Sequence, residues 1–384
     1  MINKMSFWKT MPVVVQSTKQ HNTFTQIVDE EYLLNKINRE LKTAHINFEY
    51  NIYENHDLNE YFILKMKKFF DEQYSNSQDI HLLFEKDIYE FFTLNSLVVV
   101  FYSPNTKETM GYIVGKKIKL NINSKCIDTL EVSFFCIHKK FRNKHLGPYF
   151  INVILKEFIL RYNISVSTYA LSDNIRSPYY TIKNNIHRPI NIKHLKKCKF
   201  LPDELDCEKY QHFDTNKDVD LVYLNNIEVP DTLLNLLYKK LNTFQSRYFT
   251  VFKELSKNEI KKIFKNKSFH SFIVFNKDKT IKDFISLYEL KLNLTKLNLK
   301  YKNSSIYTMF FENYNVSNIR STLELISEYC YKNNILDVIS FFDIFPVKDY
   351  NDIKCLYGEG SLYYYIFNYN MINIPNHKIS YVTI

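Results

Sequence analysis

The sequence predicts an internally duplicated α/β or α+β protein, and three observations favour this fold class. Helical and strand-like patterns alternate along the chain, and the order of elements in the second half is similar to that in the first. Apolar residues make up 45% of the 384 residues, which is enough for a large core. No short-period repeat or linker rich in Pro, Gly or Ser interrupts the chain. We place the boundary near Asn225, which gives predicted domains 1–224 and 225–384.

Apolar periodicity identifies most elements in both halves. In the first half it predicts a helix at 58–74 and strands at 97–102, 111–114 and 131–137. In the second half it predicts helices at 233–241, 257–264 and 319–333, strands at 271–275, 284–290 and 306–311, and further strands near the end.

Composition excludes several classes of protein. The net charge is +10, but acidic residues are interleaved throughout and no arginine-rich tract is present, so we expect no nucleic-acid partner. Six cysteines at irregular spacings, without a CxxC pair, indicate neither a zinc site nor a disulfide scaffold. The N-terminus lacks the apolar region of a signal peptide, and the longest apolar run, 97–102, is too short to span a bilayer. We therefore expect a soluble, cytoplasmic and monomeric protein without a metal.

Residues 131–160 contain the pattern most informative about chemistry. Residues 132–137 form a nearly continuous apolar run, which is typical of a central strand buried on both faces. A basic turn follows, with His138, Lys139, Lys140, Arg142, Lys144 and His145 inside eight positions. Pro148 suits the first turn of the next helix, whose free N–H groups and positive dipole end would face that turn. The sequence therefore predicts an anion site.

The basic turn also has the spacing of a known phosphate-binding loop. Arg142, His145 and Gly147 fit R-x-x-G-x-G, the acyl-CoA pyrophosphate loop of acetyltransferase-like folds, with His145 in place of the first glycine. Alone, this pattern also fits an ordinary solvated loop, and both interpretations stay open at this point.

Four segments together resemble one enzyme family. EVSFFCIHKKFRNKHLGP, beginning at Glu131, closely resembles the signature of glycylpeptide N-myristoyltransferase. Three further segments agree and lie in family order: SFWKTMPV (6–13), HRPIN (187–191) and YGEGSLYYYIFNY (357–369). On these motifs the chain is identified as a divergent member of that family.

The resemblance implies a fold and a reaction. The fold is α+β, with two acetyltransferase-like (GNAT-like) halves related by pseudo-twofold symmetry around a saddle-shaped mixed sheet. The first half would bind myristoyl-CoA as co-substrate, and the second would supply most of the peptide groove. The reaction would transfer the tetradecanoyl group to the α-amine of an N-terminal glycine by direct attack on the thioester, releasing CoA.

The resemblance also implies catalytic residues. Phe134 and Phe135 match the pair whose backbone N–H groups form an oxyanion hole, which suits the tetrahedral oxyanion of thioester aminolysis. The family's base is the C-terminal carboxylate, here that of Ile384, and Thr168 lies where the family has a helper threonine. No Ser/His/Asp or Cys/His constellation is needed, and Cys136, in mid-strand, is interpreted as inert packing and not as an acyl-enzyme nucleophile.

Binding residues follow from the same matches. The acyl-CoA site would comprise Ser6, Phe7, Trp8, Tyr74, Cys136, Ile137, Arg142, Asn143, Lys144, His145, Leu146 and Gly147. The peptide site would comprise Asp79, Leu82, Phe84, Thr308 and Glu359, although these positions also fit ordinary surface or core residues.

Three departures from the family pattern leave alternatives open. Ser133 replaces an Asn, and His145 stands in the pyrophosphate loop. Glu359 replaces an Asp, and its own carboxylate would attract a basic residue of the substrate. The rival hypotheses are another CoA-dependent N-acyltransferase of the GNAT type and a catalytically inactive homologue that binds acyl-CoA or peptides.

Overall fold

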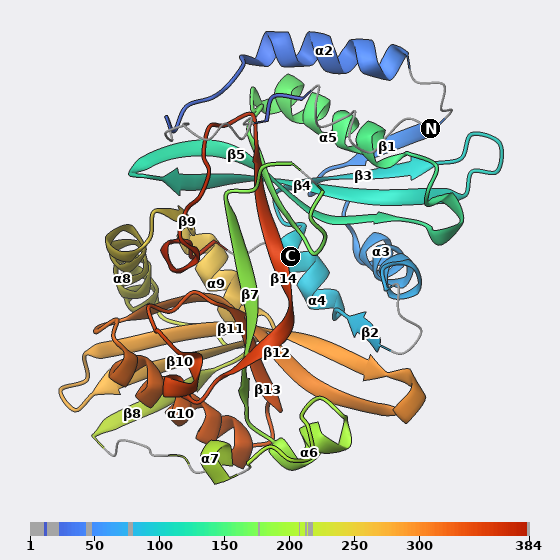
Figure 1. Ribbon diagram of the computed structural model, residues 1–384. Coiled ribbons are helices and arrows are strands. Elements are labelled where there is room, and N and C mark those ends of the chain that lie inside the picture. The colour runs from blue at the N-terminus through green and yellow to red at the C-terminus, as the bar shows by residue number, and fades with distance from the viewer. Residues whose placement is uncertain are drawn as a thin grey trace.

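A computed structural model describes residues 11–13, 23–43, 48–75, 80–175, 177–206, 208–211, 213 and 218–381. Within this part of the chain, fourteen strands form one mixed sheet (Figure 1). The path through the sheet is β1-β3-β4-β5-β6-β14-β7-β13-β12-β11-β10-β8, with β2 paired to β11 and β9 paired to β4.

Two units of ten elements each follow one another along the chain. The first consists of β1 (Glu49–Tyr53), α3 (Glu60–Gln73), β2 (Ile80–Leu83), α4 (Lys86–Phe92), β3 (Ser96–Tyr102), β4 (Thr109–Ile122), β5 (Lys125–Ile137), α5 (Gly147–Tyr162), β6 (Ser167–Leu171) and β7 (Thr181–Pro189). The second consists of β8 (Val219–Leu224), α8 (Asp231–Tyr248), β9 (Val251–Lys253), α9 (Lys257–Lys265), β10 (Phe269–Asn276), β11 (Ile281–Leu294), β12 (Leu299–Phe311), α10 (Val316–Lys332), β13 (Val338–Phe342) and β14 (Leu356–Phe367). Helices α2 (Glu30–Lys42), α6 (Ile192–Lys197) and α7 (Glu208–Gln211) lie outside this repeat.

The sheet has the pseudo-twofold symmetry that the resemblance implies. Each strand of the first unit has a counterpart in the second: β1 corresponds to β8, β2 to β9, and so on to β7 and β14. When every strand is replaced by its counterpart, the result is the same strand order read from the other end of the sheet. The parallel pairs β5–β6 and β12–β13 occupy equivalent positions, and each is joined by a helix, α5 or α10. The predicted duplication is therefore confirmed.

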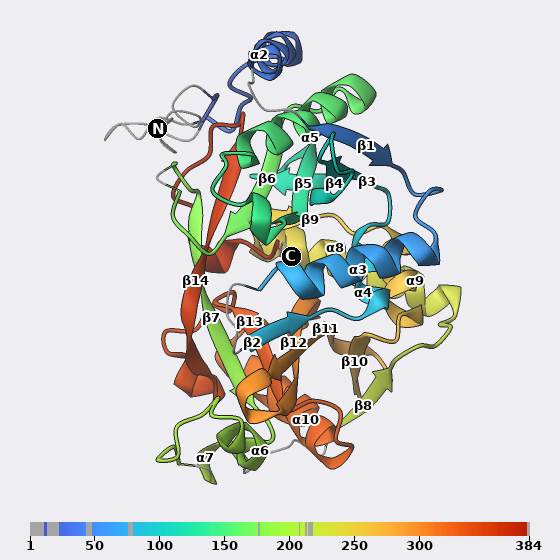
Figure 2. The ribbon, with the colours of Figure 1, turned by 90° about the vertical axis from the view of Figure 1, so that its right-hand side faces the viewer.

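Each unit also contributes strands to the other. β14 pairs with β6 of the first unit, β7 pairs with β13 of the second, and β7 and β14 run side by side between the two parts (Figures 1 and 2). The small strands β2 and β9 cross over in the same reciprocal way. A reaction centre between the units would thus be bounded by segments far apart in the sequence.

The predicted helices and strands are confirmed in type and place, although β4, β5, β11 and β12 extend well beyond their predicted ranges. The sequence analysis assigned no element to the segments that form α2, α4, α6, α7, β1, β2, β6, β7, β8 and β9. β8 pairs with β10 of the second unit, whereas the predicted boundary at Asn225 leaves it in the first domain. The functional division into 1–224 and 225–384 stays a prediction.

Helix α5 packs closely on the strands of the first unit, and α2 lies on the side of α5 that faces away from the sheet (Figure 1). A Cβ on Gly111 would lie 2.7 Å from the Cys136 carbonyl oxygen and 2.9 Å from the Phe150 ring. A Cβ on Gly115 would lie 2.7 to 2.9 Å from atoms of Phe158, Leu130 and Ile154. These two glycines of β4 therefore set the helix–sheet distance. Every helix in the described part is too short or too polar to cross a membrane.

Substituting Gly115→Ala should lower the free energy of unfolding by roughly 1–3 kcal/mol, because the added methyl overlaps three buried side chains at once. Gly147→Ala is the matched control, since its Cβ would meet only the Phe135 ring, at 3.7 Å. Denaturant unfolding of both variants measures the difference. Equal stabilities would contradict the close packing of α5 on β4.

Candidate functional site

A β-bulge interrupts β5 at the two predicted oxyanion-hole residues. Val114 of β4 pairs with Ser133 and Tyr112 pairs with Cys136, so Phe134 and Phe135 together face one residue of β4. A bulge leaves the extra residue out of the hydrogen-bond ladder and turns its backbone groups elsewhere. The predicted oxyanion donors therefore lie where the regular ladder breaks.

The bulge holds Phe134 in an unusual backbone conformation. Its φ is +43°, which is rare for a bulky residue and carries strain. Its ring is 4% exposed and contacts Phe70, Phe84 and Tyr89 at centroid distances of 5.6, 5.7 and 5.0 Å. This aromatic packing stabilises a conformation that the backbone alone disfavours.

The neighbouring strand diverges just before the bulge. β5 and β6 pair in parallel only at Leu130↔Ser167 and Glu131↔Thr168. Beyond Glu131, no described strand pairs with β5 on that side. The bulge and the unpaired edge thus occur on the same few residues.

The basic turn after β5 is tied to the end of α3. The Arg142 side chain donates from Nε to the Ile137 carbonyl at 2.9 Å, and its guanidinium also donates to the Gln73 carbonyl. Lys139 Nζ donates to the Glu72 carbonyl at 2.8 Å. These cations satisfy carbonyls at a helix C-terminus that has no basic residue in its own last turn. The structure gives Arg142 a role in holding the turn, and its contact with a pyrophosphate stays a prediction.

The remaining predicted loop residues surround the start of α5. Asn143 and His145 have φ values of +62° and +57°, and Leu146, at the N-cap, makes no side-chain cap. Lys144 and His145 are exposed and form no ion pair within the described residues, whereas Lys140 pairs with Glu108 at 2.6 Å. An uncapped helix N-terminus beside exposed cationic side chains can hold an anion.

Cys136 is unsuited to nucleophilic catalysis. The thiol is buried, and burial raises its pKa to about 11 against the opposing effect of Arg142. The thiol form therefore prevails at neutral pH, which supports the interpretation of Cys136 as packing. Tyr74, predicted to lie near the thioester, is the C-cap residue of α3, and its ring contacts that of Phe70 at a centroid distance of 6.0 Å.

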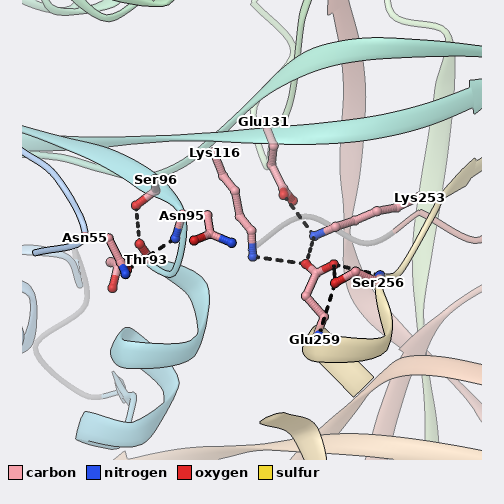
Figure 3. A network of polar contacts seen from close by, with 9 residues as sticks. All are labelled: Asn55, Thr93, Asn95, Ser96, Lys116, Glu131, Lys253, Ser256 and Glu259. Carbon is pink, nitrogen blue, oxygen red and sulfur yellow. Dashed lines mark hydrogen bonds and ion pairs between the residues drawn. The ribbon is translucent and has the colours of Figure 1, made fainter. Parts of the chain in front are cut away.

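Thr168 lies in the interior beside a buried ionic network. It is 0% exposed, its Oγ1 donates to the Tyr365 carbonyl of β14 at 3.1 Å, and its register partner in β5 is Glu131. Lys253 of β9 lies 3.4 Å from Glu131 and 3.9 Å from Glu259 of α9 (Figure 3). Lys116 of β4 lies 3.4 Å from the same Glu259 oxygen.

This network joins the two units electrostatically. Burial lowers the pKa of Lys116 to about 8, with Lys253 adding to the shift. Burial alone would lower the pKa of Lys253 as well. The negative charge of Glu131, together with that of other neighbours, outweighs this effect and raises the pKa of Lys253. Removing one partner would leave an uncompensated buried charge, so the four side chains fix β9 and α9 against β4 and β5.

The predicted peptide residues are distributed over both units. Phe84 and Thr308 are each 7% exposed, whereas Glu359 is exposed in β14, at the bulge where this strand loses its pairing with β7. Asn185 Nδ2 donates to the Glu359 carbonyl at 2.8 Å. In the same bulge Gly360 has a φ of +79°, a conformation that favours glycine.

His187 was not assigned a role from the sequence, although it begins the HRPIN segment. Its Nδ1 lies 2.8 Å from Ser340 Oγ, which donates to Asn303 Oδ1 at 2.7 Å. Nδ1 must therefore donate, which leaves Nε2 as an acceptor facing Gly358, where a Cβ would lie 2.2 Å away. Burial lowers the pKa of His187 to about 4, so the ring is neutral.

Five predicted site residues lie outside the described part of the chain, namely Ser6, Phe7, Trp8, Asp79 and Ile384. Of Leu82 only the backbone is described, and it pairs with Leu292 of β11.

Comparisons with known proteins show the family of the chain. The family model described as "Myristoyl-CoA:protein N-myristoyltransferase, N-terminal domain" matches residues 18–181, and the model of the C-terminal domain matches 207–381. The glycylpeptide N-tetradecanoyltransferase of Candida glabrata is 25% identical over 70% of this chain and 64% of its own length. That of Plasmodium falciparum is 28% identical over 72% of this chain and 67% of its own length. The chain thus spans about two thirds of these relatives.

A solved structure shares the fold. Saccharomyces cerevisiae N-myristoyltransferase with bound myristoyl-CoA superposes with a TM-score of 0.77 and 18% identity, covering 98% of this chain and 94% of the other.

Substituting Lys144→Glu should weaken CoA binding at least about tenfold at low salt, because it places a negative charge beside the uncapped start of α5. The same change should leave stability within about 0.5 kcal/mol, since an acidic residue favours a helix N-terminus and the side chain is exposed. Isothermal titration calorimetry with CoA measures the affinity. Lys193→Glu, an exposed change of the same charge on α6, is the control, and equal affinities for the two variants would contradict an anion site at α5.

Proposed function

Because the chain belongs to the myristoyl-CoA:protein N-myristoyltransferase family, we propose that it transfers the tetradecanoyl group from myristoyl-CoA to the α-amine of an N-terminal glycine. The observation that carries this proposal is the bulge at Phe134, which lies on the unpaired edge of β5, shortly before the uncapped start of α5. Backbone donors for an oxyanion and an anion site for a pyrophosphate would thus lie at the two ends of one short segment.

The internal duplication supports binding of the CoA moiety in the first unit. The segment between β5 and α5 carries six basic side chains, whereas the equivalent segment between β12 and α10, residues 312–315, reads ENYN. Glu312 would repel a pyrophosphate, and Asn315 already caps α10 by accepting from Asn318 N. Only the first of the two equivalent helix starts is suited to phosphate.

The proposed chemistry needs only a positioned amine and a stabilised oxyanion. The deprotonated glycine amine attacks the thioester carbonyl, a C–N bond forms, and negative charge develops on the carbonyl oxygen. Backbone N–H groups of Phe134 and Phe135 would stabilise that charge, an effect of roughly 3–4 kcal/mol. The C–S bond then breaks, CoA leaves as the thiolate, and the nitrogen loses its remaining excess proton.

The glycine ammonium must first lose a proton, and we propose the C-terminal carboxylate as the base. In a chain that ends at Ile384, this group follows Tyr381 by three residues, a reach of roughly 11 Å at most. Tyr381 is 1% exposed and packs against Tyr364 at 6.3 Å. The Thr168 hydroxyl would assist by orienting the amine, and Ser133 supplies a shorter side chain in place of an Asn.

The peptide would lie against the second unit. Phe84 and Thr308 are nearly buried and suited to the first residues after glycine, and exposed Glu359 would attract a basic residue further along. The neutral His187, facing Gly358, adds a hydrogen-bond acceptor next to the bulge of β14 that carries Glu359.

We also propose a cytoplasmic location, supported by free thiols at all five cysteines of the described residues, which fits a reducing compartment. The monomeric state stays a prediction.

The transfer is tested by incubating the protein with alkyne-tagged myristoyl-CoA and a peptide that begins with glycine, beside the same peptide beginning with alanine. We expect label on the glycine peptide alone, measured by mass spectrometry. Label with acetyl-CoA but not with the myristoyl donor would favour a different N-acyltransferase. Acyl-CoA binding without any glycine-dependent label would favour an inactive homologue, and either result would overturn the proposal.

Removing residues 382–384 should reduce kcat at least about a hundredfold, because general-base catalysis commonly contributes 10²–10⁴-fold. Affinity for the acyl-CoA should stay within about twofold, since its proposed site lies on β5 and α5. Steady-state kinetics and calorimetry measure the two quantities. Full turnover by the truncated chain would refute the terminal carboxylate as base.

A further inference from the structure

We propose that Lys183 is a positioning residue for the transfer reaction, because its ammonium group holds the C-terminal segment, residues 374–381, in the interior, where the segment packs against both units. The inference rests on the proposed function. It adds a residue that neither the motifs nor the sequence resemblance identified.

Lys183 is one of the most completely buried side chains in the described structure. It projects from β7, is 0% exposed, and its Nζ donates to the Ile379 carbonyl at 2.5 Å. Burial lowers its pKa to about 7, and Asp343 acts in the opposite direction. A lysine is seldom fully buried without a partner, and the hydrogen-bond acceptor here is a main-chain carbonyl of the C-terminal segment.

The rest of the segment is bound on both sides of this contact. Ser380 N donates to the Val251 carbonyl at 3.0 Å, and Thr250 N donates to the Lys378 carbonyl at 2.8 Å. The Ser380 hydroxyl donates to Gln245 Oε1 of α8. The partners in these three contacts, Val251, Thr250 and Gln245, belong to the second unit or its linking residues, whereas Lys183 belongs to β7 of the first unit. Lys183 therefore attaches the C-terminal segment to the first unit as well.

Asp343 connects Lys183 to the start of the segment. Its carboxylate accepts from Asn376 Nδ2 at 2.5 Å and from Asn184 N and Nδ2 at 3.0 and 2.8 Å. Asn184 is the neighbour of Lys183 in β7. Two successive residues of β7 therefore hold the segment at two points, one directly and one through Asp343.

The contact lies in the opening that corresponds to the proposed thioester site of the first unit. β12 and β13 pair in parallel only as far as Ser305↔Ser340, just as β5 and β6 separate after Glu131. Beyond that pair is a small cavity with room for about one water molecule. It is lined by Lys183, Ser380, Gln245 and Thr308 together with apolar residues of β12, of β13 and of the turn after β13.

This placement relates Lys183 to the predicted peptide site and to the proposed base. Thr308, a predicted peptide contact, lines the same cavity, and the chain leads from Ile379 to the proposed base at Ile384 within five residues. Without the ammonium, the Ile379 carbonyl would lose its donor while still buried, which favours release of the segment. Lys183 thus fixes where the final residues begin their path to the reaction centre.

Lys183→Met tests the proposal, with Lys354→Met as the matched control. Lys354 is also buried and forms an ion pair with Glu324 at 2.8 Å, but its partner lies on α10 and not on the C-terminal segment. We expect Lys183→Met to lower kcat at least about tenfold, to leave acyl-CoA affinity within about twofold, and to accelerate hydrogen exchange in residues 378–381. Lys354→Met should change none of the three.

A double-mutant cycle with removal of residues 382–384 separates positioning from a general loss of structure. If Lys183 acts through the segment, Lys183→Met should cost little further activity in the truncated chain. The proposal would be overturned if the two changes reduced kcat independently, so that their fold-effects multiplied in the double variant. It would also be overturned if hydrogen exchange of residues 378–381 in Lys183→Met were the same as in the unmodified protein. If Lys183→Met fails to unfold cooperatively, Lys183→Gln, which keeps a donor, replaces it and should show the same pattern at smaller size.

Hydrogen exchange also keeps the two proposals distinguishable. If truncation leaves turnover unchanged, the terminal base is refuted, whereas faster exchange in Lys183→Met would still establish that Lys183 holds the segment. Unchanged exchange would refute Lys183 whatever the activity.

Discussion

The separation of β5 from β6 after the pair Glu131↔Thr168 is the constraint on which the rest of the site depends. Two parallel strands that stayed paired would use the backbone N–H groups of residues 132–137 in the sheet. Because they diverge, and because β5 bulges at Phe134, these groups are available at the point where the basic turn and α5 begin. Everything around this break stabilises it: the aromatic rings hold Phe134, Arg142 and Lys139 tie the turn to α3, and the glycines of β4 let α5 approach.

The duplication explains how one architecture serves two different purposes. Each unit has a parallel strand pair that opens near its middle, and each opening is followed by a helix. In the first unit the opening is followed by a basic turn suited to an anion. In the second, an acidic residue follows, and Lys183 and Ser380 line the opening instead. The reciprocal exchange of β7 and β14 brings the two openings together in one sheet, so a residue of β7 can position the end of the second unit.

Local patterns were sufficient to predict helices α3, α5, α8, α9 and α10 and the central parts of the long strands, because periodicity reports on neighbours in the sequence. The oxyanion-hole pair stays a prediction. The sequence does not show that Phe134 has a positive φ, because aromatic residues disfavour that conformation unless packing enforces it. Arg142 was expected to bind phosphate from its place in a motif, but one of its two backbone partners, the Gln73 carbonyl, lies on α3, some seventy residues away. Lys183 has no local signal, since a single lysine in a polar strand gives no indication that its side chain will be buried against Ile379.

The central claim is that acyl-CoA lies across the β5 bulge and the start of α5. A crystal structure with a non-hydrolysable myristoyl-CoA analogue that retains the carbonyl group tests this most directly. We expect the carbonyl oxygen to lie within hydrogen-bonding distance of the Phe134 and Phe135 amides, with the pyrophosphate at the N-terminus of α5. A carbonyl oxygen bound elsewhere, or a pyrophosphate away from residues 142–147, would contradict it.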